Sequence, residues 1–182
     1  KFTTTEDESY PPFLSNSFKN LIVEQTQDRK MLSNTVVPRD PIYMAFGLGM
    51  SNSSTLNLDI LNNTHLYVVR ETNNKINKQT IQSRVANKIK SFFAPENNKL
   101  GQNLALNELL RDILTLEGVK NIYTKNEKDG SSLETISFLS FNPLYERSDI
   151  NLVNQNITLP YFKFPYLYSP LTVAKRIKVI DE

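Results

Sequence analysis

The sequence predicts an α+β domain in which two helices pack on one face of a mostly antiparallel sheet, with extended N- and C-terminal arms. Two helix-periodic stretches lie between residues 80 and 118, and two strand-like segments flank them on each side. This order of elements is typical of a sandwich with its helices on one side of the sheet. Both ends of the chain lack such periodicity and contain prolines, which predicts the arms. A length of 182 residues suits one domain with arms.

Two amphipathic helices form the centre of the predicted fold. The apolar positions of the first helix recur at helical spacing: Ile81, Val85, Ile89, Phe92 and Phe93. Pro95 ends this helix near Phe93, because the residue before a proline leaves the helical region. The second helix has its own apolar stripe: Leu106, Leu109, Leu110, Ile113 and Leu114. Gly118 is typical of a helix end with positive φ.

Four strands are predicted to supply the sheet. Their apolar, aromatic and β-branched residues occupy four ranges: Ile42–Met50, His65–Arg70, Val119–Thr124 and Leu133–Phe141. Asp129–Gly130 separates the last two and is typical of a tight hairpin turn. Gly47 and Gly49 in the first strand spell GLG, but the third glycine and the following helix of a dinucleotide fingerprint are missing.

The predicted domain organisation has three parts. Residues 1–40 form an N-terminal arm with a short helix that Ser17 caps, and residues 41–142 form the α+β core. Residues 143–182 form a C-terminal arm rich in proline and aromatic residues. Prolines at positions 143, 160, 165 and 170 argue against a helix or a central strand there.

The C-terminal arm contains the candidate protein–protein interface. The candidate residues are Tyr161, Phe162, Phe164, Tyr166, Leu167 and Tyr168. Its five aromatic side chains carry about 750–1,250 Å² of surface that can be buried. Proteins seldom leave an apolar patch of that size exposed. The segment therefore covers either its own domain or a partner, and the sequence favours neither.

Residues for catalysis, cofactors or metals are scarce. The chain has no cysteine and one histidine, His65, which lies in an apolar strand and is expected to be structural. No catalytic, cofactor-binding or metal-binding residue is predicted, and the chain is not expected to be an enzyme. Glu108 and Asp112 are one helical turn apart, and two carboxylates are all that a glycosidase needs. A carboxylate-based cell-wall hydrolase thus remains an alternative, although this pair is expected on a solvated helix face.

Charge and hydropathy bear on the remaining partner classes. The formal net charge is +2, and the densest basic cluster, Lys175, Arg176 and Lys178, is expected to be a solvated face. A nucleic-acid-binding α+β module is an alternative that this charge disfavours, so no nucleic-acid partner is expected. No apolar run approaches 18 residues, so no membrane span is expected either. No small-molecule substrate is predicted.

Four segments in the same order resemble the C-terminal part of a baseplate wedge protein of T-even-like contractile-tailed phages, a family related to the baseplate J-like group. The segments are VPRDPIYMAF, the run VANKIKSFFAPENNKLGQNLALNELLRDILTLEGVKNIYT, ISFLSFNPLYE and ITLPYFKFPYLYSP. The resemblance covers about residues 37–170. Its most specific parts are FFAPENNKLGQ, the helix end LRDILTLEGV and the aromatic LPYFKFPYLY.

The resemblance implies a structural role. Proteins of this family form the inner frame of the tail baseplate, so it implies a virion protein assembled in the host cytoplasm. The implied partners are further copies of the chain, most simply as a dimer, and other wedge proteins. Family members are longer than 182 residues, so a C-terminal domain or an unusually short relative is expected. The family has no catalytic residue to carry over.

Overall fold

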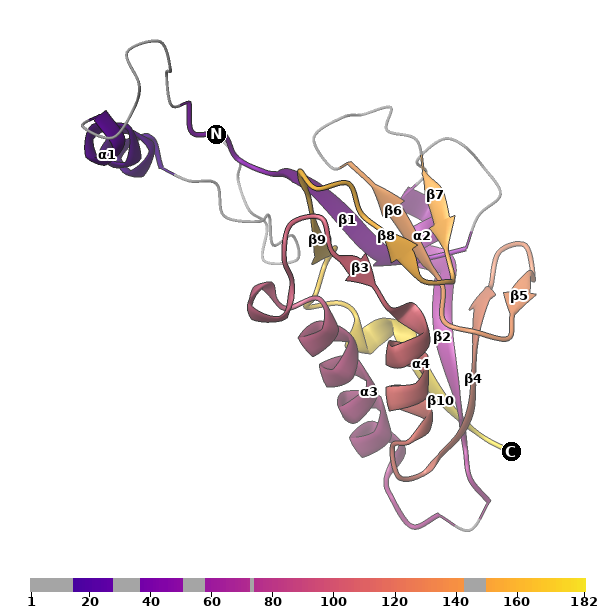
Figure 1. Cartoon of the computed structure of the whole chain (residues 1–182). Helices are drawn as coiled ribbons and strands as arrows, with labels where there is room; N and C mark the ends of the chain where they lie inside the picture. Colours follow the sequence, from indigo (N-terminus) through magenta and orange to yellow (C-terminus); the bar gives the residue numbers. More distant parts are fainter. Residues whose placement is uncertain (1–14, 28–36, 51–57, 73, 143–149) are drawn as a thin grey trace.

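The computed structural model describes residues 15–27, 37–50, 58–72, 74–142 and 150–182. It confirms the α+β class, with mostly antiparallel sheets against which helices pack (Figure 1). The strands divide between two four-stranded sheets and a short two-stranded one, whereas the sequence predicts a single sheet.

The first sheet, here called the β1 sheet, has the strand order β7-β6-β1-β9. Its strands are β1 (Ile42–Leu48), β6 (Phe138–Phe141), β7 (Asn151–Val153) and β9 (Lys163–Leu167). β6 pairs antiparallel with β1 and β7, while β9 lies parallel to β1 at the sheet edge. Residues far apart in the chain therefore meet in this sheet.

The second sheet, here called the β2 sheet, has the strand order β10-β2-β4-β5. Its strands are β2 (Thr64–Arg70), β4 (Val119–Asn126), β5 (Ser132–Leu133) and β10 (Ile177–Asp181). β10 lies parallel to β2, and the other pairings are antiparallel. A short antiparallel ladder joins β3 (Asn103–Leu104) to β8 (Ile157–Thr158).

The two predicted helices are present and lie side by side in front of the β2 sheet (Figure 1). They are α3 (Lys78–Phe92) and α4 (Leu106–Leu114). Asn77 caps α3, since its side-chain oxygen accepts a hydrogen bond from the Gln79 N–H at 3.0 Å. The remaining helical segments are α1 (Asn16–Gln27), α2 (Leu58–Asn63), η1 (Pro95–Asn97) and η2 (Ala174–Arg176).

The main core fills the space between these helices and the two sheets. Leu66 and Val68 from β2 and Ile122 from β4 pack against the apolar stripes of α3 and α4. Phe93 joins the layers, because its ring lies 5.2–5.3 Å from those of Phe46 and Phe138, measured between centroids. Most positions of the two predicted stripes are thus buried, but Phe92 and Leu110 are only partly buried and Leu114 is 37% exposed.

The C-terminal segment differs from the predicted arm. β9 and β10 complete the two sheets, so residues 163–181 belong to the body of the fold and do not extend from it. Pro165 is compatible with β9 because an edge strand has no partner for the missing N–H on its outer side. Local sequence patterns carry no signal for such distant parallel pairings.

Two local predictions are also corrected. The segment predicted as one strand from Leu133 to Phe141 is divided, since β5 belongs to the β2 sheet and β6 to the β1 sheet. Ser137 lies at this crossover, where its hydroxyl donates to the carbonyl of Gly49 at 2.9 Å. Ser15, and not Ser17, caps α1 by accepting from the Phe18 N–H at 3.2 Å. The short helix α2 was not predicted.

Candidate protein–protein interface

The structure separates the six predicted interface residues into two groups. Tyr166 and Leu167 are buried, and Phe164 and Tyr168 are partly buried within the same chain. Tyr161 and Phe162 remain exposed, with 84% and 41% of their surface accessible. Only this pair is available to a partner in the chain as it stands.

Four of the candidates are internal because β9 places them against β1 and its neighbours. The rings of Phe164 and Tyr166 each meet the ring of Tyr43 edge-on, with centroids 6.1 Å apart. Tyr168 meets Phe141 in the same way at 5.1 Å. These contacts form a second, smaller core on the other face of the β1 sheet from the main core.

Two residues that the sequence did not single out lie beside the exposed pair. Ile42 is 44% exposed, and its N–H donates to the carbonyl of Phe162 at 3.0 Å. Leu100 is 54% exposed and precedes Gly101, whose backbone lies against that of Tyr161. The ring centroids of Tyr161 and Phe162 are 5.1 Å apart. We call Ile42, Leu100, Tyr161 and Phe162 the exposed apolar cluster.

The loop PENNKLGQ supports this cluster. The buried side-chain amide of Asn98 donates to the carbonyls of Phe92 and Ala94, both at 2.8 Å, which closes the end of α3. Gln102 donates in turn to Asn98. The N–H of Gly101 then donates to the carbonyl of Lys163 at 3.1 Å, which fastens the loop to the start of β9.

Gly101 is required at this point for two reasons. Its φ is +65°, which favours glycine, and an added Cβ would lie 2.5 Å from the Cα of Tyr161. The apolar Leu100 inside an otherwise polar loop was the available sequence signal for this part of the surface. Tyr161 is 61 residues from Leu100 in the numbering, so the sequence could not show that the two segments meet.

A polar groove of about 360 Å³ lies between α3, the PENNKLGQ loop and α4. Glu108 and Asp112 both line it, as their spacing on one helix predicts, and Lys88 lines it from α3. Asp112 forms an ion pair with Lys88 at 3.5 Å, and Glu108 is exposed. Both carboxylates therefore line a concave surface. The ion pair between Asp112 and Lys88 is the kind of interaction that is typical of a solvated helix face.

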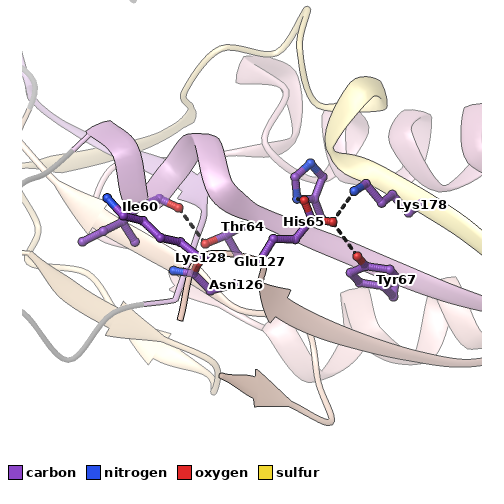
Figure 2. A network of polar contacts seen from close by, with 8 residues as sticks. All are labelled: Ile60, Thr64, His65, Tyr67, Asn126, Glu127, Lys128 and Lys178. Carbon is purple, nitrogen blue, oxygen red and sulfur yellow. Dashed lines mark hydrogen bonds and ion pairs between the residues drawn. The ribbon is translucent and has the colours of Figure 1, made fainter. Parts of the chain in front are cut away.

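A second polar cluster lies on the face of the β2 sheet turned away from α3 and α4 (Figure 2). Side chains alternate along a strand, so His65 and Tyr67 project from this face while Leu66 enters the core. Glu127 accepts hydrogen bonds on one carboxylate oxygen from Tyr67, at 2.7 Å, and from Lys178. Its other oxygen lies 3.7 Å from Nδ1 of His65.

These contacts shift three pKa values. Hydrogen bonds from Lys178 and Tyr67 lower the pKa of Glu127 from 4.5 to about 2. The hydrogen bond to Glu127 raises the pKa of Tyr67 to about 12. Burial, followed by the charge of Lys178, lowers the pKa of His65 below its ordinary value. The cluster links β2, β10 and the residue that follows β4, and burial of His65 favours its neutral form.

The predicted basic cluster does not converge on one point. Lys178 pairs with Glu127, while Arg176 donates to the side-chain oxygen of Asn62 at 3.3 Å. Within the described ranges, no group of three or more His, Cys, Asp or Glu residues could hold a metal ion. No helix in the same part of the chain is long and apolar enough to cross a membrane.

Comparisons with models of protein families, with curated proteins and with solved structures found no match to this chain.

Proposed function

We propose that this chain is a structural assembly subunit that associates through its exposed apolar cluster. The observation that carries the proposal is the contrast between a densely packed core and an exposed Tyr161, 84% accessible, on a loop fixed by backbone hydrogen bonds. Aromatic side chains held on rigid backbone are typical anchors of protein interfaces, because little conformational entropy is lost on binding.

The resemblance to baseplate wedge proteins supports a more specific form of the proposal. The chain would act in the baseplate of a contractile phage tail, with copies of itself and other wedge proteins as partners. Two of the segments that carry the resemblance, PENNKLGQ and LPYFKFPYLY, meet in the structure through the bond from Gly101 to Lys163. The same two segments supply Leu100, Tyr161 and Phe162 to the exposed apolar cluster.

The sheet edges favour association through side chains over strand addition. On β9, Pro165 lacks an N–H, and the carbonyl of Lys163 already accepts from Gly101. On β10, the carbonyl of Ile177 accepts from the side chain of Gln82 at 2.9 Å. An added strand needs a row of free backbone groups, and these features interrupt that row on both strands.

Light scattering over a concentration series tests the proposal. We expect the wild type to exceed its monomer mass of 20.9 kDa as concentration rises. The double variant Tyr161→Ser with Phe162→Ser should remain at the monomer mass. Leu152→Ser is the matched control, because Leu152 is a similarly exposed apolar residue on β7, at the opposite edge of the β1 sheet from β9. A wild type that stays monomeric throughout would overturn self-association.

Nucleic-acid binding is the second candidate function. It is favoured by the stacked rings of Tyr67 and Tyr123, whose centroids lie 5.0 Å apart on the face of the β2 sheet that carries Glu127. Bases can stack on aromatic residues of such a face. This alternative requires binding to a labelled oligonucleotide that weakens steeply with added salt. Assembly through the apolar cluster requires no such binding.

A further inference from the structure

We infer that helix α1 of a second copy of the chain packs on the exposed apolar cluster. The inference rests on the proposed self-association and identifies the segment that performs it. It follows from two apolar surfaces of the same chain that are both exposed: one on α1, and the other at the junction of β1, β9 and the PENNKLGQ loop.

The first surface is the apolar face of α1. Phe18 and Leu21 lie one turn apart and are 48% and 45% exposed. A helix of 12 residues is marginal by itself in water and is stabilised chiefly by burying its apolar face. In Figure 1, α1 lies apart from both sheets. An ion pair between Lys19 and Asp40 links it to the segment that precedes β1.

The second surface has charges that complement those of α1. Glu24 is exposed on α1, and Lys19, the basic residue of this helix, already pairs with Asp40 of its own chain. Lys99 directly precedes Leu100 of the exposed apolar cluster, and Lys163 directly follows Phe162. Apolar contact between the helix and the cluster would therefore bring charges of opposite sign together.

The areas are consistent with a reciprocal exchange. The exposed parts of Phe18, Leu21 and the four cluster residues come to on the order of 500 Å² at one site. In a pair with twofold symmetry each chain gives its helix and receives the other, so the contact occurs twice. The total, on the order of 1,000 Å², lies near the lower limit for a specific interface.

Disulfide cross-linking tests the inference cleanly because the chain contains no cysteine. Leu21→Cys in an untagged chain is mixed with Tyr161→Cys in a chain that carries a larger tag, and both are oxidised. We expect a cross-linked species of the mixed mass. Leu152→Cys in place of Tyr161→Cys is the control and should give little of this species, because β7 lies at the opposite edge of the β1 sheet.

The outcomes separate this inference from the proposed function. If light scattering shows association but the mixed cross-link does not form, self-association stands and the role of α1 is overturned. A single chain carrying both Leu21→Cys and Tyr161→Cys shows whether the disulfide forms within one chain or between two chains. A disulfide closed within that monomer, in place of a linked pair, would show that α1 covers its own chain and would overturn the exchange.

Discussion

Glu127 joins three strands of the β2 sheet through its side chain and the residues around it. Tyr67 of β2 and Lys178 of β10 lie opposite each other in the register, and Glu127 follows β4 directly. The N–H of Glu127 donates to the carbonyl of Asn63 at 2.9 Å, which fixes where its carboxylate lies. This arrangement orients a solvent-facing row of side chains on the β2 sheet.

The alkaline titration of Tyr67 tests the role of Glu127. In the wild type, one tyrosine should titrate near 12, because ionised Tyr67 could not donate to Glu127 and would face its negative charge. Glu127→Gln removes that charge, so this titration should move toward the ordinary value of 10.0. Ultraviolet absorbance of tyrosinate measures the change, and Tyr67→Phe identifies the step by deleting it. An unchanged step in Glu127→Gln would contradict the assignment.

His65 offers a second test because it is the only histidine in the sequence. Its single imidazole resonance should titrate below the ordinary value of 6.5, since burial and Lys178 both disfavour the charged ring. The unfolded chain then binds more protons than the folded one in this range, so stability should decrease as the pH falls below about 6.5. NMR measures the titration directly. A midpoint at or above 6.5 would refute the burial argument.

At the level of single residues, the sequence predicted the kind of role and not the partners. His65 was expected to be structural because it lies in an apolar strand, and that role stays a prediction. Its approach to Glu127 brings together positions about 60 residues apart, which no local pattern encodes. Tyr161 was predicted as an interface residue together with Tyr166, yet β9 buries Tyr166 and leaves Tyr161 outside.

Among the elements, the PENNKLGQ loop depends on Gly101. Gly101→Ala should lower the free energy of unfolding, because the positive φ costs about 1–2 kcal/mol and the new Cβ would meet the backbone of Tyr161. Gly130→Ala is the matched control, since its φ is +75° but nothing lies within 4 Å of the added Cβ. Urea denaturation compares the two. Equal losses would show that the contact with Tyr161 contributes nothing.

Two aromatic residues near the start of β9 are expected to differ in what they stabilise. One supports the fold and the other supports association. Phe164→Ala should destabilise the fold by about 2 kcal/mol or more, because its ring packs on Tyr43 within the smaller core. Phe162→Ala should cost less stability but weaken association, since its ring is 41% exposed. Thermal unfolding and light scattering on the same samples measure both effects. The reverse order of stability losses would contradict the position assigned to β9.

The elements that the sequence predicted are those with local signals. Periodicity, Pro95 and the stripe from Leu106 located α3 and α4, and apolar runs located β1, β2 and β4. The parallel strands β9 and β10 were missed because their pairing partners lie more than 100 residues earlier. The prolines and aromatic residues of the C-terminal segment predicted an arm from local sequence alone. In the structure, aromatic residues of this segment pack in the smaller core.

For the whole molecule, the C-terminal segment closes both sheets and also supplies Tyr161 and Phe162. β9 and β10 each add to a strand from the first half of the chain, so folding and the display of the exposed apolar cluster depend on the same residues. The polar groove borders the PENNKLGQ loop and the Glu127 cluster lies on the β2 sheet; the proposed association uses neither.

The most direct test is sedimentation equilibrium on the wild type and Tyr161→Ala. Because the Tyr161 side chain is 84% exposed, its removal should change the free energy of unfolding by about 0.5 kcal/mol at most. The dissociation constant of the self-associated form should nevertheless rise about tenfold or more, which corresponds to about 1.4 kcal/mol of lost binding. An unchanged dissociation constant, with the fold intact, would contradict association through the exposed apolar cluster.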